Sequence, residues 1–325
     1  MNRLPRIALP FIFALATVLL LSCGDDDEPA TFEEEVSVTT SAGDIFGTLV
    51  RPNTGEAVPV VLIIAGSGPT DRDGNTASLP GTNNSLKMIA DELLLSNIAS
   101  LRYDKRGVGA SAEAGNTAAG LTFNDYVTDA ISWIKILRKE SRYSSVGIIG
   151  HSEGSLIGMI TASAADVDFF ISISGAGVPA DEILLEQLST LPAVVIEYSE
   201  YVLSELRKGN TVSDIPDDLQ FLFGESAQPY LTSWIQFDPS LELSRLDMPV
   251  AVIHGTRDIQ VPIEQASILA ESKPNATLKI IDGMNHILKN APEDPNLNLL
   301  TYTDPEIPLT EEFTMFLADY LADLR

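Results

Sequence analysis

Short apolar runs alternate along this chain with segments of helical periodicity, and this alternation limits the fold more than any other feature. The run at residues 58–65 is typical of a strand buried on both faces of a parallel sheet. Similar runs recur at residues 98–103, 146–149, 169–173, 250–254 and 276–281. Helical patterns are found at residues 85–96, 122–140, 153–164, 263–272 and 310–324. The pattern predicts an α/β fold with a mostly parallel sheet flanked by helices.

Two segments depart from this alternation. Residues 36–40 and 45–50 alternate with period two around a short turn, and they predict an opening hairpin. Residues 176–240 contain helix-like stretches without a buried strand. The strand pattern resumes at Met248, so this segment is interpreted as an insertion into one domain that spans residues 35–325.

The first 22 residues have the layout of a signal peptide. Arg3 and Arg6 precede a mostly apolar run at residues 7–21, which is short for a membrane-spanning helix of about 20 residues. The alternative is a permanent N-terminal anchor helix. The ending before Cys23 resembles the lipobox of bacterial lipoproteins, in which the cysteine is lipidated and becomes the first residue of the mature chain.

An acidic stretch follows Cys23, and residues 23–34 are expected to form a solvated tether. It resembles the surface-export signals of Bacteroidetes lipoproteins. These resemblances imply a protein of the bacterial cell envelope, anchored by lipid at Cys23 to the outer membrane and exposed at the cell surface.

Composition excludes several classes of partner and cofactor. The chain has 46 acidic and 20 basic residues and a net charge of -26, which opposes binding to nucleic acid. A single cysteine cannot form an internal disulfide, and three histidines do not make a zinc-finger cluster. No structural metal site of the zinc-finger or iron–sulfur kind is therefore expected.

Residues 150–154 match the pattern G-x-S-x-G, with Ser152 at its centre. They follow a predicted strand and precede a predicted helix, which is the context of a nucleophile elbow. Small residues on both sides of the serine allow a tight turn that exposes its hydroxyl. Ser152 is therefore the predicted nucleophile, and the alternative is a serine that only caps the helix.

A nucleophilic serine needs a base and an acid that orients it, in the chain order Ser, Asp or Glu, His for such a fold. Downstream of Ser152 the candidate bases are His254 and His286. His254 closes a buried strand, whereas His286 follows the last strand, so His286 is the predicted base. Asp258 lies in the loop that should carry the acid. Asp282 is the alternative acid, only four residues before His286.

The oxyanion formed on attack needs two backbone N–H donors. One is expected from Glu153, directly after the nucleophile, and the other from the glycine-rich loop at residues 66–69. Ser67 is the predicted second donor, with Gly68 as the alternative.

In their order, these motifs resemble the α/β-hydrolase superfamily, and most closely bacterial carboxylesterases and serine-aminopeptidase-like hydrolases. The resemblance covers roughly residues 36–325 and rests on five segments: Gly66 to Pro69, Leu101 to Ser111, Gly150 to Gly154, His254 to Asp258, and His286. It implies hydrolysis through an acyl-enzyme without a cofactor. Ala65 stands where many relatives carry a histidine, so any role of that histidine is missing here.

The predicted function is the hydrolysis of carboxylic esters. A peptidase or amidase with the same residues, and a non-catalytic surface lipoprotein that binds a ligand, are the alternatives. The insertion is predicted to form a helical cap above Ser152, and it holds eleven acidic and two basic residues. A small neutral ester is therefore the expected substrate.

Overall fold

The computed structural model describes residues 31–115 and 120–324, which form one eight-stranded sheet in the order β1-β2-β4-β3-β5-β6-β7-β8. β1 and β2 form an antiparallel hairpin, β2 runs antiparallel to β4, and all other neighbours are parallel. The strands are β1 (Thr31–Thr40), β2 (Gly43–Pro52), β3 (Val58–Ile64), β4 (Ala99–Tyr103), β5 (Tyr143–His151), β6 (Phe169–Ile173), β7 (Val250–Gly255) and β8 (Thr277–Ile281).

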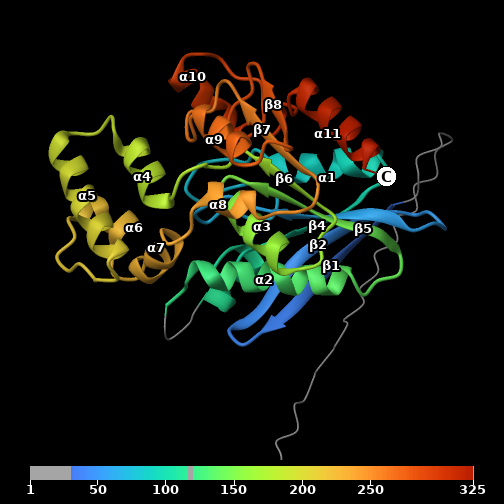
Figure 1. Ribbon diagram of the computed structural model, residues 1–325, viewed down its shortest axis with the longest axis horizontal. Helices are drawn as coiled ribbons and strands as arrows, with labels where there is room; N and C mark the ends of the chain where they lie inside the picture. Colours follow the sequence, from blue (N-terminus) through green and yellow to red (C-terminus); the bar gives the residue numbers. More distant parts are fainter. Residues whose placement is uncertain (1–30, 116–119, 325) are drawn as a thin grey trace, which may run out of the picture.

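Helices cover both faces of this sheet (Figure 1). On β3, Val61 and Ile63 pack with α1 and α11, while Leu62 and Ile64 pack with α2 and α3. The apolar run of β3 is continuous because both of its faces are buried. The helices named here are α1 (Ser85–Leu95), α2 (Phe123–Leu137), α3 (Glu153–Ala164) and α11 (Glu311–Asp323). This architecture confirms the predicted α/β fold.

The hairpin begins earlier than predicted. β1 starts at Thr31, inside the predicted tether of residues 23–34. β1 lies at the edge of the sheet, and its acidic residues Glu33 and Glu35 are exposed. Charged side chains on an edge strand oppose pairing with other chains, so an acidic run is compatible with a strand there. Residues 23–30 of the tether, the signal peptide and Cys23 lie outside the described residues.

Between β6 and β7 the chain forms a group of helices that we call the helical segment, residues 180–235. It projects from one side of the sheet (Figure 1, left) and has its own apolar cluster, with Val202, Leu206 and Phe223 at its centre. Its helices are α4 (Ala180–Leu188), α5 (Ala193–Arg207), the 3₁₀ turn η2 (Asp217–Leu219), α6 (Gln220–Phe223) and α7 (Gln228–Trp234).

Four helical pieces besides α11 follow the helical segment. α8 and α9 pack with the face that holds α2 and α3. These pieces are α8 (Pro239–Ser244), α9 (Glu264–Ser272), α10 (Pro295–Leu300) and the 3₁₀ turn η3 (Thr301–Thr303), and a further 3₁₀ turn, η1 (Gly109–Gly115), follows β4.

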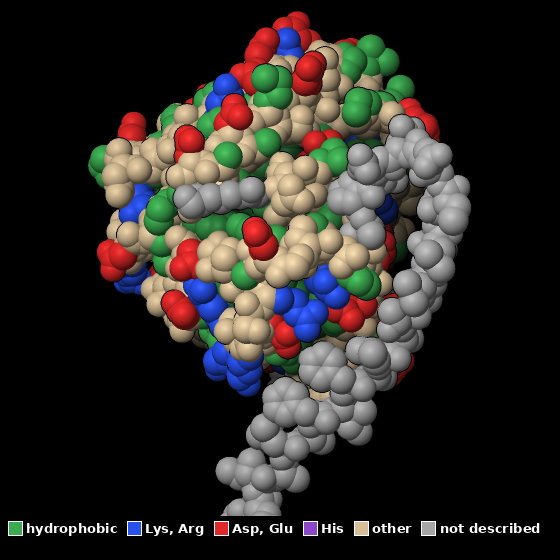
Figure 2. All heavy atoms as spheres, turned by 90° about the vertical axis from the view of Figure 1, so that its right-hand side faces the viewer, with side chains coloured by type: hydrophobic (Ala, Val, Ile, Leu, Met, Phe, Trp, Pro, Cys, Tyr) green, Lys and Arg blue, Asp and Glu red, His purple; other side chains and the backbone are tan. Residues whose placement is uncertain are grey.

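The described part of the chain contains no helix that is both long and apolar enough to cross a membrane. The face turned away from the helical segment carries acidic and basic side chains intermixed (Figure 2).

Candidate active site

Ser152 sits in a strained turn between β5 and α3. Its backbone has φ 55° and ψ -121°, a conformation that few non-glycine residues adopt. A Cβ on Gly154 would lie 2.3 Å from the Ile64 carbonyl oxygen, and a Cβ on Gly150 would lie 2.3 Å from the Gly154 carbonyl oxygen. The turn therefore needs glycine on both sides of the serine, as expected for a nucleophile elbow.

Asp258 and His286 are hydrogen-bonded to each other. Nδ1 of His286 lies 2.8 Å from Oδ2 of Asp258, whose side chain is fully buried. Oδ1 of Asp258 accepts from the backbone N–H groups of Gln260 and Val261, both at 2.9 Å. Burial alone would raise the pKa of Asp258, but its attraction to His286 and the hydrogen bond between them lower this pKa to about 2.

This pairing determines which nitrogen of His286 is free. The Asp258 carboxylate is ionised near neutral pH and only accepts hydrogen bonds, so the proton of His286 is on Nδ1. Nε2 then remains as a proton acceptor.

A close backbone contact brings the two loops together. A Cβ on Gly255, at the end of β7, would lie 2.0 Å from the Met284 carbonyl oxygen. The Arg257 N–H donates to the same oxygen at 2.9 Å. Because only glycine permits this contact, the loop that carries Asp258 packs directly on the loop that carries His286.

The alternative residues are engaged elsewhere. Asp282 is exposed and accepts a hydrogen bond from the Thr256 hydroxyl at 3.0 Å. His254 is buried, and its Nε2 lies 2.8 Å from the Val261 carbonyl oxygen and 3.4 Å from Oδ2 of Asp258. The geometry therefore pairs His286 with Asp258.

His151 is a site residue that the sequence analysis missed. Its Nε2 lies 2.7 Å from the His286 carbonyl oxygen, and the two rings are 4.8 Å apart. A carbonyl only accepts, so Nε2 carries the proton. Burial, with a smaller effect of His286, lowers the pKa of His151 to about 3. His151 thus ties the residue before Ser152 to the loop of His286, a pairing over 135 positions that no local motif shows.

Ser152 opens onto a cavity of about 240 Å³, which Ser67, Gly68 and Glu153 also line. The residues predicted to supply the oxyanion donors therefore line the same space as the predicted nucleophile. Most other lining residues are apolar and come from the helical segment and its neighbours: Leu156, Ala176, Val178, Ala180, Ile183, Leu184, Phe221, Leu222, Ala227, Leu231, Trp234, Pro239 and Val261. We call this space the acyl pocket.

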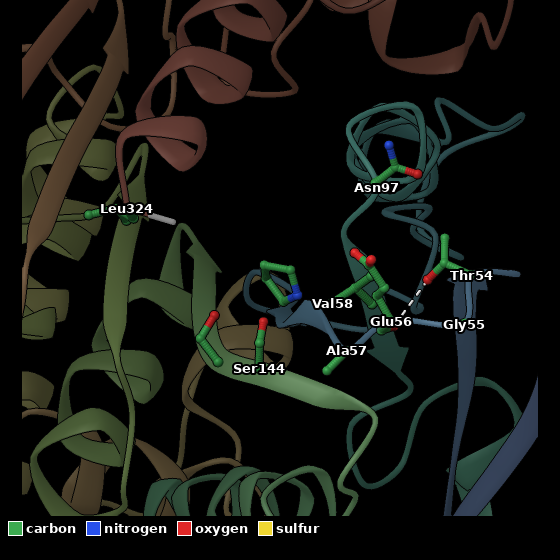
Figure 3. A pocket seen from close by; sticks show the side chains of 10 residues that line it. Thr54, Gly55, Glu56, Ala57, Val58, Asn97, Ser144 and Leu324 are labelled. Carbon is green, nitrogen blue, oxygen red and sulfur yellow. Dashed lines mark hydrogen bonds between the residues drawn. The ribbon is translucent and has the colours of Figure 1, made fainter.

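A second cavity, of about 800 Å³, lies where β3 and β5 begin, whereas Ser152 follows the other end of β5. Figure 3 shows Glu56, Asn97 and Ser144 around it. Among the described residues that line it, Glu56 is the single carboxylate and none is a histidine. It is larger than the acyl pocket, but its described lining residues do not combine a nucleophile with a base, so Ser152 remains the candidate active site.

Comparisons with known proteins agree with this fold. A family model described as serine aminopeptidase, S33, matches residues 82–213. Esterase EstD of Thermotoga maritima is 28% identical over 295 residues, which cover 89% of this chain and 68% of the relative.

Solved structures share the fold. Est1E from Butyrivibrio proteoclasticus has a TM-score of 0.56 at 18% identity, and the match covers 89% of this chain and 99% of that one. A thermophilic esterase from Thermogutta terrifontis has a TM-score of 0.54 at 18% identity, covering 90% and 99% of the two chains. Fold and site thus define an α/β-hydrolase. Within that superfamily, the chain is similar to esterases.

Proposed function

We propose that this carboxylic ester hydrolase uses Ser152 as nucleophile, His286 as base and Asp258 as the acid that orients the base. The observation that carries the proposal is the 2.8 Å bond between His286 Nδ1 and Asp258 Oδ2, on the loops beside the strained turn of Ser152. This bond leaves Nε2 of His286 available for the serine proton.

The reaction proceeds in two halves. In the first, Ser152 Oγ attacks the ester carbonyl while His286 Nε2 takes its proton, and the alcohol leaves with that proton. In the second, His286 removes a proton from water, the hydroxide attacks the acyl-enzyme, and the acid is released as Ser152 regains its proton. The backbone N–H groups of Ser67 and Glu153 stabilise the oxyanion in both halves.

The acyl pocket supports a neutral, short to medium acyl group as the substrate. Its apolar lining favours a hydrocarbon chain, and its volume of about 240 Å³ is small for a ligand site. Phe221 lines the pocket although it is 83% exposed, so the pocket reaches the surface of the helical segment.

A panel of p-nitrophenyl esters and aminoacyl-anilides tests this function. We expect turnover of the neutral esters. The variants Ser152→Ala and His286→Ala should each lose nearly all of it, and the double variant should be no worse, because these residues act as one unit. A Ser152→Ala protein with activity near that of the wild type would contradict the proposal.

A serine aminopeptidase is the second candidate, because the matching family model carries that description. Among the residues placed around the acyl pocket, Glu153 is the single carboxylate. Both of its oxygens are already bonded, to Lys105 and to Tyr230. The pocket lining thus supplies no free carboxylate for a substrate ammonium group, which favours esters over aminoacyl-anilides in the same panel.

We also propose that the protein is anchored to the bacterial cell envelope through a lipid on Cys23, at the outer membrane and facing outward. The support is the sequence of residues 1–28 alone. Cys23→Ser should move the protein from the detergent phase to the aqueous phase and block cleavage before residue 23. An intact mass with an unmodified Cys23 would contradict the anchor.

A further inference from the structure

A buried ion pair lies beneath the turn of Ser152. Nζ of Lys105, just after β4, is 3.1 Å from Oε2 of Glu153, and each side chain is only 1% exposed. Burying two charges costs desolvation free energy that the pair barely recovers, so such a pair is weak evidence for a stabilising role. Its contacts indicate a different role.

Lys105 also holds the loop that carries the predicted second oxyanion donor. Its Nζ donates to the Gly66 carbonyl oxygen at 2.6 Å. That carbonyl belongs to the same peptide unit as the Ser67 N–H. The peptide is trans, so its C=O and N–H point in opposite directions. When Lys105 fixes the carbonyl on its own side, the Ser67 N–H is turned to the other side.

The peptide passes directly beside the nucleophile. A Cβ on Gly66 would lie 3.1 Å from the Cβ of Ser152, and Ser67 lines the acyl pocket. The hydrogen bond from the Lys105 ammonium also polarises this peptide, which strengthens its N–H as a donor.

The remaining oxygen of Glu153 connects this arrangement to the wall of the acyl pocket. The hydroxyl of Tyr230, on α7, donates to Oε1 of Glu153 at 2.6 Å. Tyr230 itself lines the pocket. Tyr126 contacts both Lys105 and Tyr230. Nζ of Lys105 lies 4.8 Å from the Tyr126 ring centre, and the rings of Tyr126 and Tyr230 pack edge-on with their centres 5.9 Å apart.

We propose that Lys105 is a positioning residue for the oxyanion hole. Lys105 orients the Ser67 N–H toward the developing negative charge. Glu153 holds the Lys105 ammonium in place, and Tyr230 connects Glu153 to the helical segment that binds the acyl group. This inference rests on the proposed function of Ser152. Such preorganised donors act on the transition state more than on the bound ester, so their loss reduces kcat and leaves KM nearly unchanged.

The test compares Lys105→Met with Lys273→Met. Lys273 is also buried and donates through Nζ to a backbone carbonyl, that of Leu246 at 2.5 Å, outside the acyl pocket. For a neutral p-nitrophenyl ester, Lys105→Met should lower kcat by about 10- to 100-fold and change KM by less than about threefold. Lys273→Met should keep the kcat of the wild type, although it too loses a buried hydrogen bond to a backbone carbonyl.

A trifluoromethyl ketone with the same acyl chain gives a readout that a structural role would not change. Ser152 adds to its carbonyl, the serine proton passes to His286, and the carbonyl oxygen becomes an alkoxide in the oxyanion hole. Lys105→Met should weaken its inhibition by the factor lost in kcat/KM, whereas Lys273→Met should not. Equal inhibition of Lys105→Met and wild type would overturn the inference.

Tyr230→Phe serves if Lys105→Met does not fold, since it removes one hydroxyl and keeps the pocket wall. Its kcat should fall by roughly three- to tenfold at unchanged KM. A wild-type kcat for Tyr230→Phe would also count against the arrangement. Fluorophosphonate labelling separates this inference from the proposed function. If the wild-type protein is not labelled at Ser152, both are wrong. If it is labelled normally and kcat is unaffected in Lys105→Met and Tyr230→Phe, only the role of Lys105 is wrong.

Discussion

Asp258 is held by three hydrogen bonds in a fully buried setting, and its carboxylate keeps the His286 ring in one orientation and one tautomer. Asp258→Asn keeps the shape but presents an amide to Nδ1, which favours the wrong tautomer. We expect kcat for esters to fall by about 10⁴-fold, as in related triads, with little change in KM.

The matched control for that variant is Asp282→Asn. Asp282 is exposed and bonds to Thr256, away from the His286 ring. Steady-state kinetics should therefore give wild-type values for this control. If Asp282→Asn lost activity and Asp258→Asn kept it, the assignment of the acid would be reversed.

His151 adds a pH dependence to stability. Its pKa is about 3 in the folded chain and about 6.5 when unfolded, so between these values only the unfolded state binds the proton. The free energy of unfolding therefore falls as pH drops below about 6.5, by about 2 kcal/mol at pH 5.

His151→Gln removes this titration and keeps a side-chain N–H for the His286 carbonyl. Urea unfolding at pH 7.5 and pH 5 gives the free energy of unfolding at each pH. The decrease of this free energy from pH 7.5 to pH 5 should be about 2 kcal/mol smaller in the variant than in the wild type. His254, which is also buried with a lowered pKa, is present in both proteins, so its effect cancels. An equal decrease in the free energy of unfolding of the two proteins would show that His151 is not uncharged in the folded protein.

At the scale of elements, the contact of α3 with β3 decides whether the nucleophile turn forms. Gly154→Ala would push a Cβ to 2.3 Å from the Ile64 carbonyl, which should lower the free energy of unfolding by about 2 to 3 kcal/mol and displace Ser152. Both the unfolding midpoint and kcat should fall. Gly55→Ala is the control, since nothing lies within 4 Å of its Cβ and its stability should stay within about 0.5 kcal/mol of wild type.

Elements with a strong local pattern were predictable from the sequence. β3 and α2 lie within a few residues of their predicted positions, because a strand buried on both faces and an amphipathic helix each have a recognisable period. β1 was predicted to start too late, because the exposed glutamates of an edge strand have the same composition as a tether.

The candidate site was predictable where local chain geometry, as at Ser152, or the order of residues along the chain, as for Asp258 and His286, indicates it. The glycines around Ser152 are visible as a motif because the turn itself needs them. The bonds of Glu153 to Lys105 and Tyr230 join residues 48 and 77 positions apart, so nothing near either partner in the sequence indicates them.

The whole molecule has a net charge of -26, and the segment at residues 176–240 contributes eleven acidic and two basic residues. A negative field at the entrance of the acyl pocket should repel anionic substrates. We expect kcat/KM for a neutral ester to exceed that of a matched anionic ester at low salt, and the difference to shrink as salt rises. A preference for the anionic ester at low salt would contradict this view of the entrance.

Reaction with a fluorophosphonate followed by peptide mapping tests the central claim most directly, because the probe forms a stable bond only with an activated serine. We predict one adduct per chain, on Ser152, formed in step with the loss of esterase activity and absent from the His286→Ala protein. Complete inactivation with the adduct on another residue, or full esterase activity with Ser152 completely labelled, would contradict the account.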